Sequence, residues 1–374
     1  MAIDLAFAPA QLTLQQEAHE LFADRCQTAT VRDLEEGALG YDPAVWQEMA
    51  QRGWLGWTFP SAYSGRDGRF LDLYLLCEEL GRFLVPSPHL DTVAVCGDLL
   101  LAAGSDAQKA RLLPAIAEGR CVVSVASLEP SGSFGPSGLA TTAARQNGDF
   151  VLSGTKLLAA FAGSADYILV TARTDSGGVA VFLVEAGSRG ISCVPLENVA
   201  GGALYLVEFD QVRAPRDALV GAADDGWPAF STSVTRAAVL QTATIVGAAR
   251  AVLDMTNQYA KDREQFGKPI GTYQAVQYMV SDILIALHSA DLLAKQAAYR
   301  IDAGMPSRRE AAMAIAFGKK AAAHLHRQAH EVHAGVGFMV EYDLQLFSRR
   351  SKYWENNLGD ARYYQQQLAT ALNI

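Results

Sequence analysis

The residues best suited to bind a charged ligand lie in the segment 259–277, YAKDREQFGKPIGTYQAVQ. Arg263, Gln265 and Phe266 place a guanidinium, an amide and an aromatic ring within four residues. Together these groups suit a diphosphate joined to adenine, because the polar groups can bind phosphate oxygens while the ring covers the base. The same segment could be a solvated connection between two helices, and spacing alone gives the two interpretations similar weight.

Two helices are expected to position this turn. Apolar residues recur at three- and four-residue spacing from Phe230 to Tyr259 and again from Val276 to Ala294. This periodicity predicts an amphipathic helix on each side. Gly267 is expected to end the first helix and Pro269 to prevent its resumption.

The turn closely resembles the R-x-x-F-G-x-x-I-x-x-x-Q segment of the acyl-CoA dehydrogenase family. In that family the segment binds the FAD pyrophosphate of the neighbouring subunit. The resemblance therefore implies that Arg263, Gln265, Phe266 and Gln274 contact FAD.

A second segment, residues 329–350, resembles the family's glycine-rich Q-x-x-G-G-x-G-[FY] loop, where FAD approaches the backbone. The resemblance implies FAD contacts at Glu331, which replaces the usual Gln, and at Gly335, while Ala334 replaces one glycine. The alternative is a loop between helices that needs glycine only for its backbone conformation.

The part of the family pattern that holds the flavin ring is altered. The T-E-P-x-x-G-S-D motif reads L-E-P-S-G-S-F here, so Leu128 replaces the Thr and Phe134 the Asp, while Ser133 is kept and is assigned to substrate binding. In the K-x-W-I-T-N strand, Leu158 replaces the Trp and Ala160 the Thr. Each lost hydrogen bond is worth ~1 kcal/mol, and more where a polar ring edge stays unpaired. The resemblance thus implies an isoalloxazine site that has lost its usual supports.

The catalytic base is also missing at the positions where relatives carry it. Removing an α-proton from an acyl thioester requires a positioned carboxylate. The three positions that the resemblance assigns to this base are Leu358, Thr235 and Thr244, and none is acidic. No catalytic residue is assigned from the sequence.

Other polar residues near these positions have ordinary structural interpretations. Glu355 is expected to pair with Lys352 on a helix surface, and Asp360 to cap a helix. Arg236 matches a family Arg that contacts CoA, with a helix-surface ion pair as an equal alternative. The histidines between His324 and His333 follow helix spacing, so no metal site is expected.

Composition limits the possible functions further. The chain has 374 residues, 50% of them hydrophobic, and a net charge of -9, which argues against nonspecific nucleic-acid binding. Its five cysteines are scattered without CxxC spacing, as in a reduced cytoplasmic protein. The first residues, MAIDLAFAPAQL, do not resemble a signal peptide, and no run approaches the ~20 apolar residues of a membrane span. A cytoplasmic protein without a membrane segment is expected.

The pattern of apolar residues and turn residues along the chain predicts three domains. Residues 1–120 read as helices, residues 121–225 as seven short strands with a hairpin turn at Asn147-Gly148, and residues 226–374 again as helices. The strands predict a small antiparallel barrel or sandwich. With the resemblance, this order implies the acyl-CoA dehydrogenase fold, with an N-terminal helical domain, a central β-domain and a C-terminal four-helix bundle.

The chain keeps the residues expected to bind the ADP part of FAD, but it has lost the usual supports of the flavin ring and the catalytic base. This combination favours one functional hypothesis. The chain would complete the FAD site of a homologous catalytic subunit in an α2β2 enzyme that introduces an α,β double bond into a bulky, for example steroid side-chain, acyl-CoA. Electrons would pass to an electron-transfer flavoprotein or a similar acceptor. The alternatives are a self-sufficient homo-oligomeric dehydrogenase with an unrecognised base, a flavin monooxygenase on the same fold, and a non-catalytic CoA-ester-binding scaffold.

Overall fold

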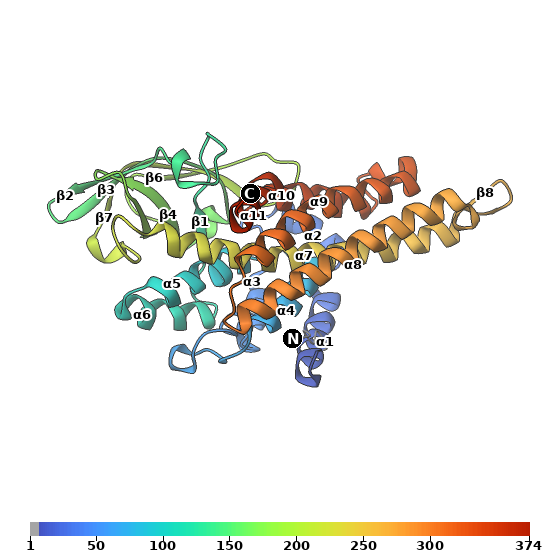
Figure 1. Ribbon diagram of the computed structural model, residues 1–374, viewed down its shortest axis with the longest axis horizontal. Helices are drawn as coiled ribbons and strands as arrows, with labels where there is room; N and C mark the ends of the chain where they lie inside the picture. Colours follow the sequence, from blue (N-terminus) through green and yellow to red (C-terminus); the bar gives the residue numbers. More distant parts are fainter. Residues whose placement is uncertain (1–6) are drawn as a thin grey trace.

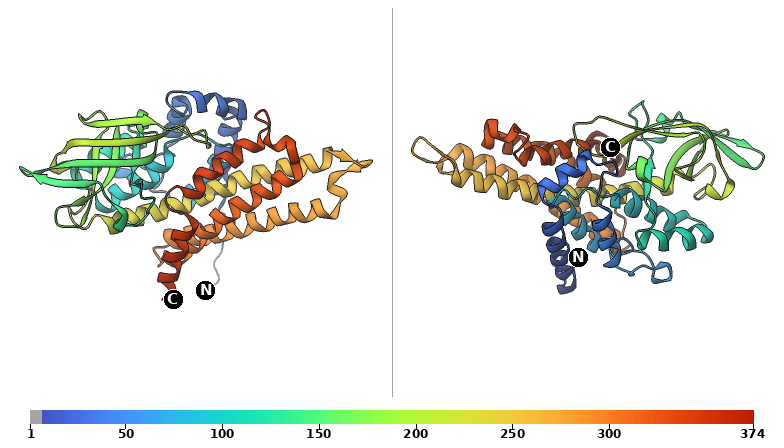
Figure 2. Two further views of the ribbon diagram at one scale, coloured as in Figure 1. Left: turned by 90° about the horizontal axis from the view of Figure 1, so that it is seen from above. Right: turned by 180° about the vertical axis from the view of Figure 1, so that it is seen from behind.

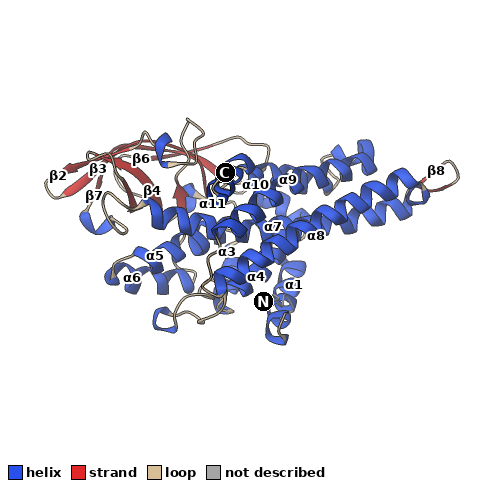
Figure 3. Ribbon diagram, viewed as in Figure 1, coloured by secondary structure: helices blue, strands red, loops and turns tan. Residues whose placement is uncertain are grey.

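The computed structural model describes residues 7–374; the first six residues, the start of the segment compared above with signal peptides, lie outside this range. Helices form both terminal parts, the strands of the middle part gather at one end of the molecule, and a short two-stranded hairpin lies at the other end (Figure 1, Figure 3). The predicted order of helices, strands and helices is confirmed. The division at residues 120/121 and 225/226 remains a prediction.

Among residues 7–120, the main elements are six α-helices and a π-helix. They are α1 (Pro9–Arg25), α2 (Thr28–Glu36), α3 (Pro43–Gln51), α4 (Phe70–Arg82), the π-helix Leu90–Gly97, α5 (Asp98–Ala103) and α6 (Asp106–Ala117). Helix α3 begins with Pro43 in its first turn, as predicted, and the Asp42 carboxylate accepts a hydrogen bond from the Ala44 N–H (2.7 Å). The π-helix continues directly into α5 and was not predicted from the sequence.

The middle of the chain forms a seven-stranded sheet. Its strands are β1 (Val123–Ala126), β2 (Thr142–Gln146), β3 (Asp149–Ala160), β4 (Tyr167–Thr174), β5 (Val179–Glu185), β6 (Ile191–Pro195) and β7 (Leu204–Ala214). The sheet order is β1-β4-β2-β3-β7-β6, with β5 paired to β4. Most pairs are antiparallel as expected, but β4 pairs in parallel with both β1 and β2. The sheet is therefore mixed.

Two local features of β3 matter for the site. The strand begins after a two-residue turn in which Asn147 (φ 52°) and Gly148 (φ 90°) are left-handed, which confirms the predicted hairpin. Its pairing with β7 shifts register between Lys156 and Ala159, and Leu158 within this irregularity has a φ of 55°. Irregularities of this kind redirect side chains, and here the affected residue faces a cavity.

The C-terminal part consists of long helices (Figure 2). They are α7 (Trp227–Asp262), α8 (Gln274–Asp302), α9 (Arg308–His333), α10 (Leu344–Asn356) and α11 (Ala361–Leu372). A hairpin of β8 (Glu264–Gln265) and β9 (Lys268–Pro269) joins α7 to α8. Helix α7 ends at Asp262, so Gly267 (φ 80°) does not end it as expected but turns the hairpin together with Phe266 (φ 55°).

Helix α7 packs against helices of both the N-terminal and the C-terminal part, including α4, α8 and α9. Its length and composition would allow it to span a membrane, but 72% of its most apolar window is buried inside the protein, as in the core helix of a globular domain. A separate apolar core lies within the β-domain. Beside this core, the buried Lys156 Nζ pairs with Glu129 Oε1 at 2.6 Å.

Candidate functional site

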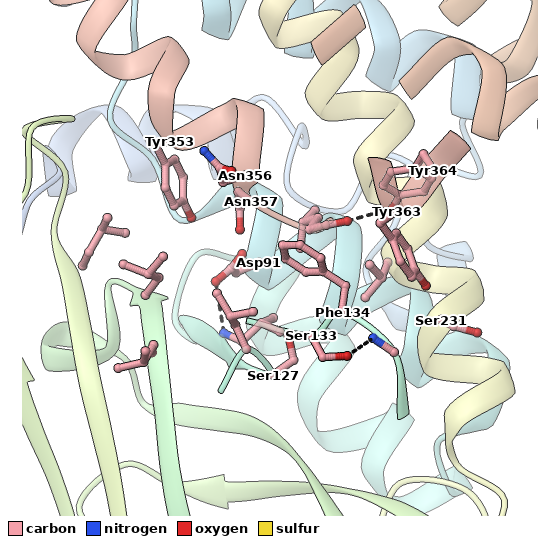
Figure 4. A pocket seen from close by; sticks show the side chains of 18 of the residues that line it. Asp91, Ser127, Ser133, Phe134, Ser231, Tyr353, Asn356, Asn357, Tyr363 and Tyr364 are labelled. Carbon is pink, nitrogen blue, oxygen red and sulfur yellow. Dashed lines mark hydrogen bonds between the residues drawn. The ribbon is translucent and has the colours of Figure 1, made fainter. Parts of the chain in front are cut away.

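Two adjoining cavities lie between the β-domain and the helices. The larger cavity, of about 260 Å³, is bounded by the β-domain, α7 and the α10–α11 connection (Figure 4). The smaller cavity, of about 100 Å³, lies toward α4 and the π-helix. Both are lined by Asp91, Ala200, Leu204 and Tyr353, so they share a wall.

The positions altered from the family pattern meet around these cavities. Leu128 and Leu158 from the β-domain, Thr235 on α7 and Leu358 line the larger cavity. Leu358 follows α10 with a φ of 56°, and its carbonyl accepts a hydrogen bond from the Tyr364 hydroxyl (2.8 Å). These side chains leave the larger cavity with few ionisable groups where a flavin ring and a base would be expected.

Four further residues that the sequence analysis singled out also line these cavities. Phe134 projects into the same cavity and its ring lies 5.8 Å from that of Tyr363 (Figure 4). Ser133 also lines the larger cavity, and its Oγ accepts a hydrogen bond from the Gly135 N–H (3.4 Å). Ala160 and Thr244 line the smaller cavity.

Asp91 is a cavity carboxylate that the sequence analysis missed. It lies in the π-helix, and its Oδ2 accepts a hydrogen bond from the Val125 N–H (3.0 Å). Burial raises the pKa of this carboxyl to about 7. A carboxylate with a raised pKa beside a cavity has the properties of a general base. The only sign of this carboxylate in the sequence was one acidic residue within the apolar run LDTVAV.

A buried lysine supports the turn that carries Leu358. The Lys319 Nζ on α9 donates to Gln241 Oε1 (3.0 Å), Trp354 O (2.6 Å) and Asn357 O (2.8 Å). Burial lowers the pKa of Lys319 to about 7, although nearby acidic groups act in the opposite direction. Lys319 therefore fixes the end of α10 beside both cavities.

Glu355, Asp360 and Arg236 make the ion pairs and the helix cap that their structural interpretations predicted. Glu355 pairs with Lys352 (Nζ–Oε1 3.0 Å), and Asp360 caps α11 by accepting from the Tyr363 N–H (2.6 Å). Arg236 forms an ion pair with Asp98, with Nε 3.0 Å from Oδ1. Its guanidinium also lies 5.2 Å from the centre of the Phe70 ring. The CoA contact of Arg236 remains a prediction.

The predicted FAD turn lies at the exposed tip of the α7–α8 hairpin, at the opposite end of the molecule from the β-domain (Figure 1). Arg263 and Gln274 are exposed, and Phe266 is 95% exposed. The Gln265 side chain donates only to the adjacent Glu264 carbonyl (2.7 Å) among the described residues. Thus none of these groups lines the cavities of its own chain.

The glycine-rich loop lies near the end of α7 that leads into this tip. The His333 ring on α9 stacks on Tyr259 of α7 at 4.4 Å, and His333 Nε2 is 3.3 Å from Thr256 Oγ1. Glu331 and Gly335 close to this stack are exposed, and a Cβ added to Gly335 would meet no atom within 4 Å. Internal packing therefore does not explain the glycine, whereas a ligand approaching the backbone would.

These features fit FAD unequally. The exposed guanidinium, amide, aromatic ring and open glycine suit a diphosphate and adenine. The larger cavity offers apolar side chains at Leu128 and Leu158, which cannot donate hydrogen bonds to a flavin ring. Because the exposed turn and the β-domain lie at opposite ends of the molecule, one FAD could not contact both the turn and the larger cavity of the same chain (Figure 1).

Comparisons with known proteins cover nearly the whole chain. Family models described as acyl-CoA dehydrogenase N-terminal, middle and C-terminal domains match residues 8–120, 124–212 and 224–369. A 3-(aryl)acrylate reductase of Clostridium sporogenes is 27% identical over 89% of this chain and 92% of that protein. A chain of the ChsE4-ChsE5 complex from Mycobacterium tuberculosis is 26% identical with a TM-score of 0.91, and 99% of each chain is covered. A variant of the Tcur3481-Tcur3483 steroid ACAD is 27% identical with a TM-score of 0.88, covering 97% of this chain and 98% of that one.

Proposed function

Because this chain belongs to the acyl-CoA dehydrogenase family, whose members are FAD-dependent flavoproteins, we propose that it is the base-lacking subunit of a heteromeric enzyme. The assembled α2β2 enzyme would form an α,β double bond in a bulky acyl-CoA such as a steroid side-chain thioester. The observation that carries this proposal is that Leu358, Thr235 and Thr244 occupy the three base positions around the cavities. None can remove an α-proton, and FAD, which accepts the β-hydride when bound, needs that step.

The position of the ADP-binding residues supports a role in a neighbouring subunit. Arg263, Gln265 and Phe266 are exposed around β8, at the opposite end of the molecule from the β-domain (Figure 1), and none of them lines either cavity. In an assembly, Arg263 would pair with a pyrophosphate whose flavin ring lies in the partner. The partner would supply the base, and this chain would supply some of the residues that bind FAD.

The outer face of α8 supports assembly through the C-terminal helices. Tyr278, Ile285 and Leu292 recur every seven residues and are 65%, 63% and 55% exposed. An apolar stripe of this kind is typical of a helix that packs against another subunit. The ChsE4-ChsE5 complex, whose name joins two subunits, supports the heteromeric form.

The sizes of the cavities also favour chemistry in the partner. The two adjoining cavities, of about 260 Å³ and 100 Å³, together reach only the lower end of the ~300–1,000 Å³ of pockets that hold a single small molecule. They are too small for both a flavin ring and a bulky acyl group.

As part of the same proposal, we assign the enzyme to the cytoplasm. Its electrons would pass to an electron-transfer flavoprotein or a similar acceptor.

The test compares the chain alone with the chain co-expressed with a homologue that carries Glu at the position of Leu358. Absorbance spectra give the FAD content, and a dye acceptor with a series of acyl-CoAs gives turnover. The chain alone should carry little FAD and show no turnover, whereas the co-purified complex should show both. A yellow homo-oligomer with one flavin per chain that reduces the dye with an acyl-CoA would refute the proposal.

Asp91 favours a second candidate function, a self-sufficient dehydrogenase in which Asp91 acts as the base. Its carboxyl lines both cavities and its pKa is raised to about 7. If the chain alone shows turnover, Asp91→Asn should abolish it while retaining FAD. Turnover that survives this substitution would exclude Asp91 as the base.

A further inference from the structure

The smaller cavity contains two buried polar side chains that lack hydrogen-bond partners among residues 7–374. His89 and Gln241 are each 1% exposed, and both line the cavity. Neither ring nitrogen of His89 has a partner, nor does the Gln241 Nε2. Buried polar groups are nearly always paired, so two unpaired groups in one cavity indicate a missing partner. The other walls are largely apolar, with Leu80, Val85, Leu90, Phe161 and Leu204.

Lys319 sets the orientation of the Gln241 amide. Its Oε1 accepts a hydrogen bond from the Lys319 ammonium at 3.0 Å. While Lys319 carries its proton, its three N–H groups donate to Gln241 and to the Trp354 and Asn357 carbonyls, so a flipped Gln241 amide would bring two donors together. In that protonation state Gln241 keeps its Nε2 as a free donor on the cavity wall.

His89 complements this donor. Burial lowers its pKa to about 4, so the imidazole is neutral at physiological pH. A neutral imidazole has one N–H donor and one acceptor nitrogen. Together with Gln241, it can bind an oxygen that accepts one hydrogen bond and, in a hydroxyl, donates another.

The charges around the cavity disfavour an anionic occupant. Arg350 is the one cationic side chain among the described lining residues, and its Nη2 is 3.1 Å from Glu35 Oε1 while its Nε donates to the Ala200 carbonyl (3.1 Å). Asp91 stands at the junction with the larger cavity. A carboxylate would have to compete with Glu35 for the Arg350 guanidinium and would be costly to bury beside Asp91.

We propose that the smaller cavity binds the far end of an acyl group that carries a neutral oxygen, a hydroxyl or a keto group, on Gln241 and His89. The preceding carbon chain would lie in the larger cavity, which shares a wall with the smaller one. This site lies within one chain and does not depend on completing a partner's FAD site.

The experiment measures binding of four six-carbon thioesters to the full chain by isothermal titration calorimetry. Hexanoyl-CoA has no oxygen at the far end, 6-hydroxyhexanoyl-CoA and 5-oxohexanoyl-CoA have a neutral one, and adipoyl-CoA has a carboxylate. Each of the two neutral oxygenated ligands should bind about tenfold more tightly than hexanoyl-CoA, as expected for pairing of buried polar groups. Adipoyl-CoA should bind no more tightly than hexanoyl-CoA.

Variants assign the preference to the two side chains. His89→Phe and Gln241→Leu should each reduce the preference several-fold, and the double variant should remove it. Thr244→Val is the matched control, because the Thr244 hydroxyl lines the same cavity but already donates to the Leu240 carbonyl (3.4 Å). That variant should keep the preference.

Several outcomes would overturn this inference. Equal affinities for hexanoyl-CoA and 6-hydroxyhexanoyl-CoA would show that water alone satisfies the two side chains. Tightest binding of adipoyl-CoA, or a preference retained in a folded double variant, would place the recognition elsewhere. Absence of binding by all four thioesters would remove the acyl site itself. The wild-type ligand series decides the question even if a variant fails to fold.

Discussion

Replacing Lys319 with Met should change how the stability of the protein depends on pH. Lys319 is 2% exposed, and burial lowers the pKa of its ammonium from 10.5 to about 7. Between pH 7 and pH 10.5 the unfolded chain therefore holds a proton that the folded chain has released. Unfolding free energy rises with pH wherever the unfolded state binds more protons. Lys319 thus makes the wild type more stable as pH increases through this window.

The size of the effect follows from the two pKa values. One pKa unit corresponds to about 1.4 kcal/mol. Between pH 7.5 and pH 9.5 the wild type should gain about 2–2.5 kcal/mol relative to Lys319→Met. At a single pH the variant combines two opposing changes, since it removes the cost of burying the Lys319 amine but leaves the Gln241, Trp354 and Asn357 oxygens without their donor. The difference between pH values is therefore the informative quantity.

Urea unfolding followed by tryptophan fluorescence at several pH values between 7 and 10 measures this difference. Lys320→Met is the matched control, because Lys320 is the next residue on α9 and is exposed. Its profile should run parallel to that of the wild type. Parallel profiles for Lys319→Met and the wild type would mean that Lys319 keeps its proton when folded, and would refute the reasoning.

Three further predictions concern the cofactor, the base and the β-domain. In the assembled enzyme, Arg263→Ala should weaken FAD binding roughly 10- to 150-fold, as expected from losing a charge-assisted contact of ~1.5–3 kcal/mol, whereas Lys261→Ala should not; fluorescence titration of FAD checks both. Leu358→Glu alone should give no dehydrogenase turnover with acyl-CoAs and a dye, because the ring supports remain absent; robust turnover would show an intact flavin site. Glu129→Ala should destabilise the chain by about 3–5 kcal/mol in urea unfolding, since it leaves the buried Lys156 charge unpaired. Replacing both partners by apolar residues should restore much of that loss, and a Glu129→Ala protein as stable as the wild type would contradict this account.

The sequence predicts the parts of the fold that depend on local chemistry. The Asn147-Gly148 turn adopts the left-handed pair that a two-residue hairpin requires, and Pro43 starts a helix where its missing N–H costs nothing. The long helices α7 and α8 follow their apolar spacing. The fold class and the FAD dependence of the family are confirmed by the family models and the related structures.

The candidate site could be predicted only in part, because its remaining residues acquire their properties from tertiary packing. Asp91 and His89 become cavity groups because a π-helix, a rare element without a clear sequence signal, brings them beside the β-domain. Lys319 reads as a surface residue on an alanine-rich helix, yet carbonyls from the end of α10 and the Gln241 amide surround it. The resemblance located the altered base positions, whereas spacing could not show which side chains lack partners.

The wall of the smaller cavity connects segments that are far apart in the chain. Glu35 on α2 pairs with Arg349 (2.9 Å) and Arg350 (3.1 Å) on α10, while these arginines also bind the Val199 and Ala200 carbonyls between β6 and β7 (3.1 Å each). Contacts of such long sequence separation form late in folding, since the intervening loops must close first. The cavity thus exists only after all three parts of the chain have docked. A ligand that occupies it selects the fully folded state by mass action and would slow the loss of newly made protein to degradation.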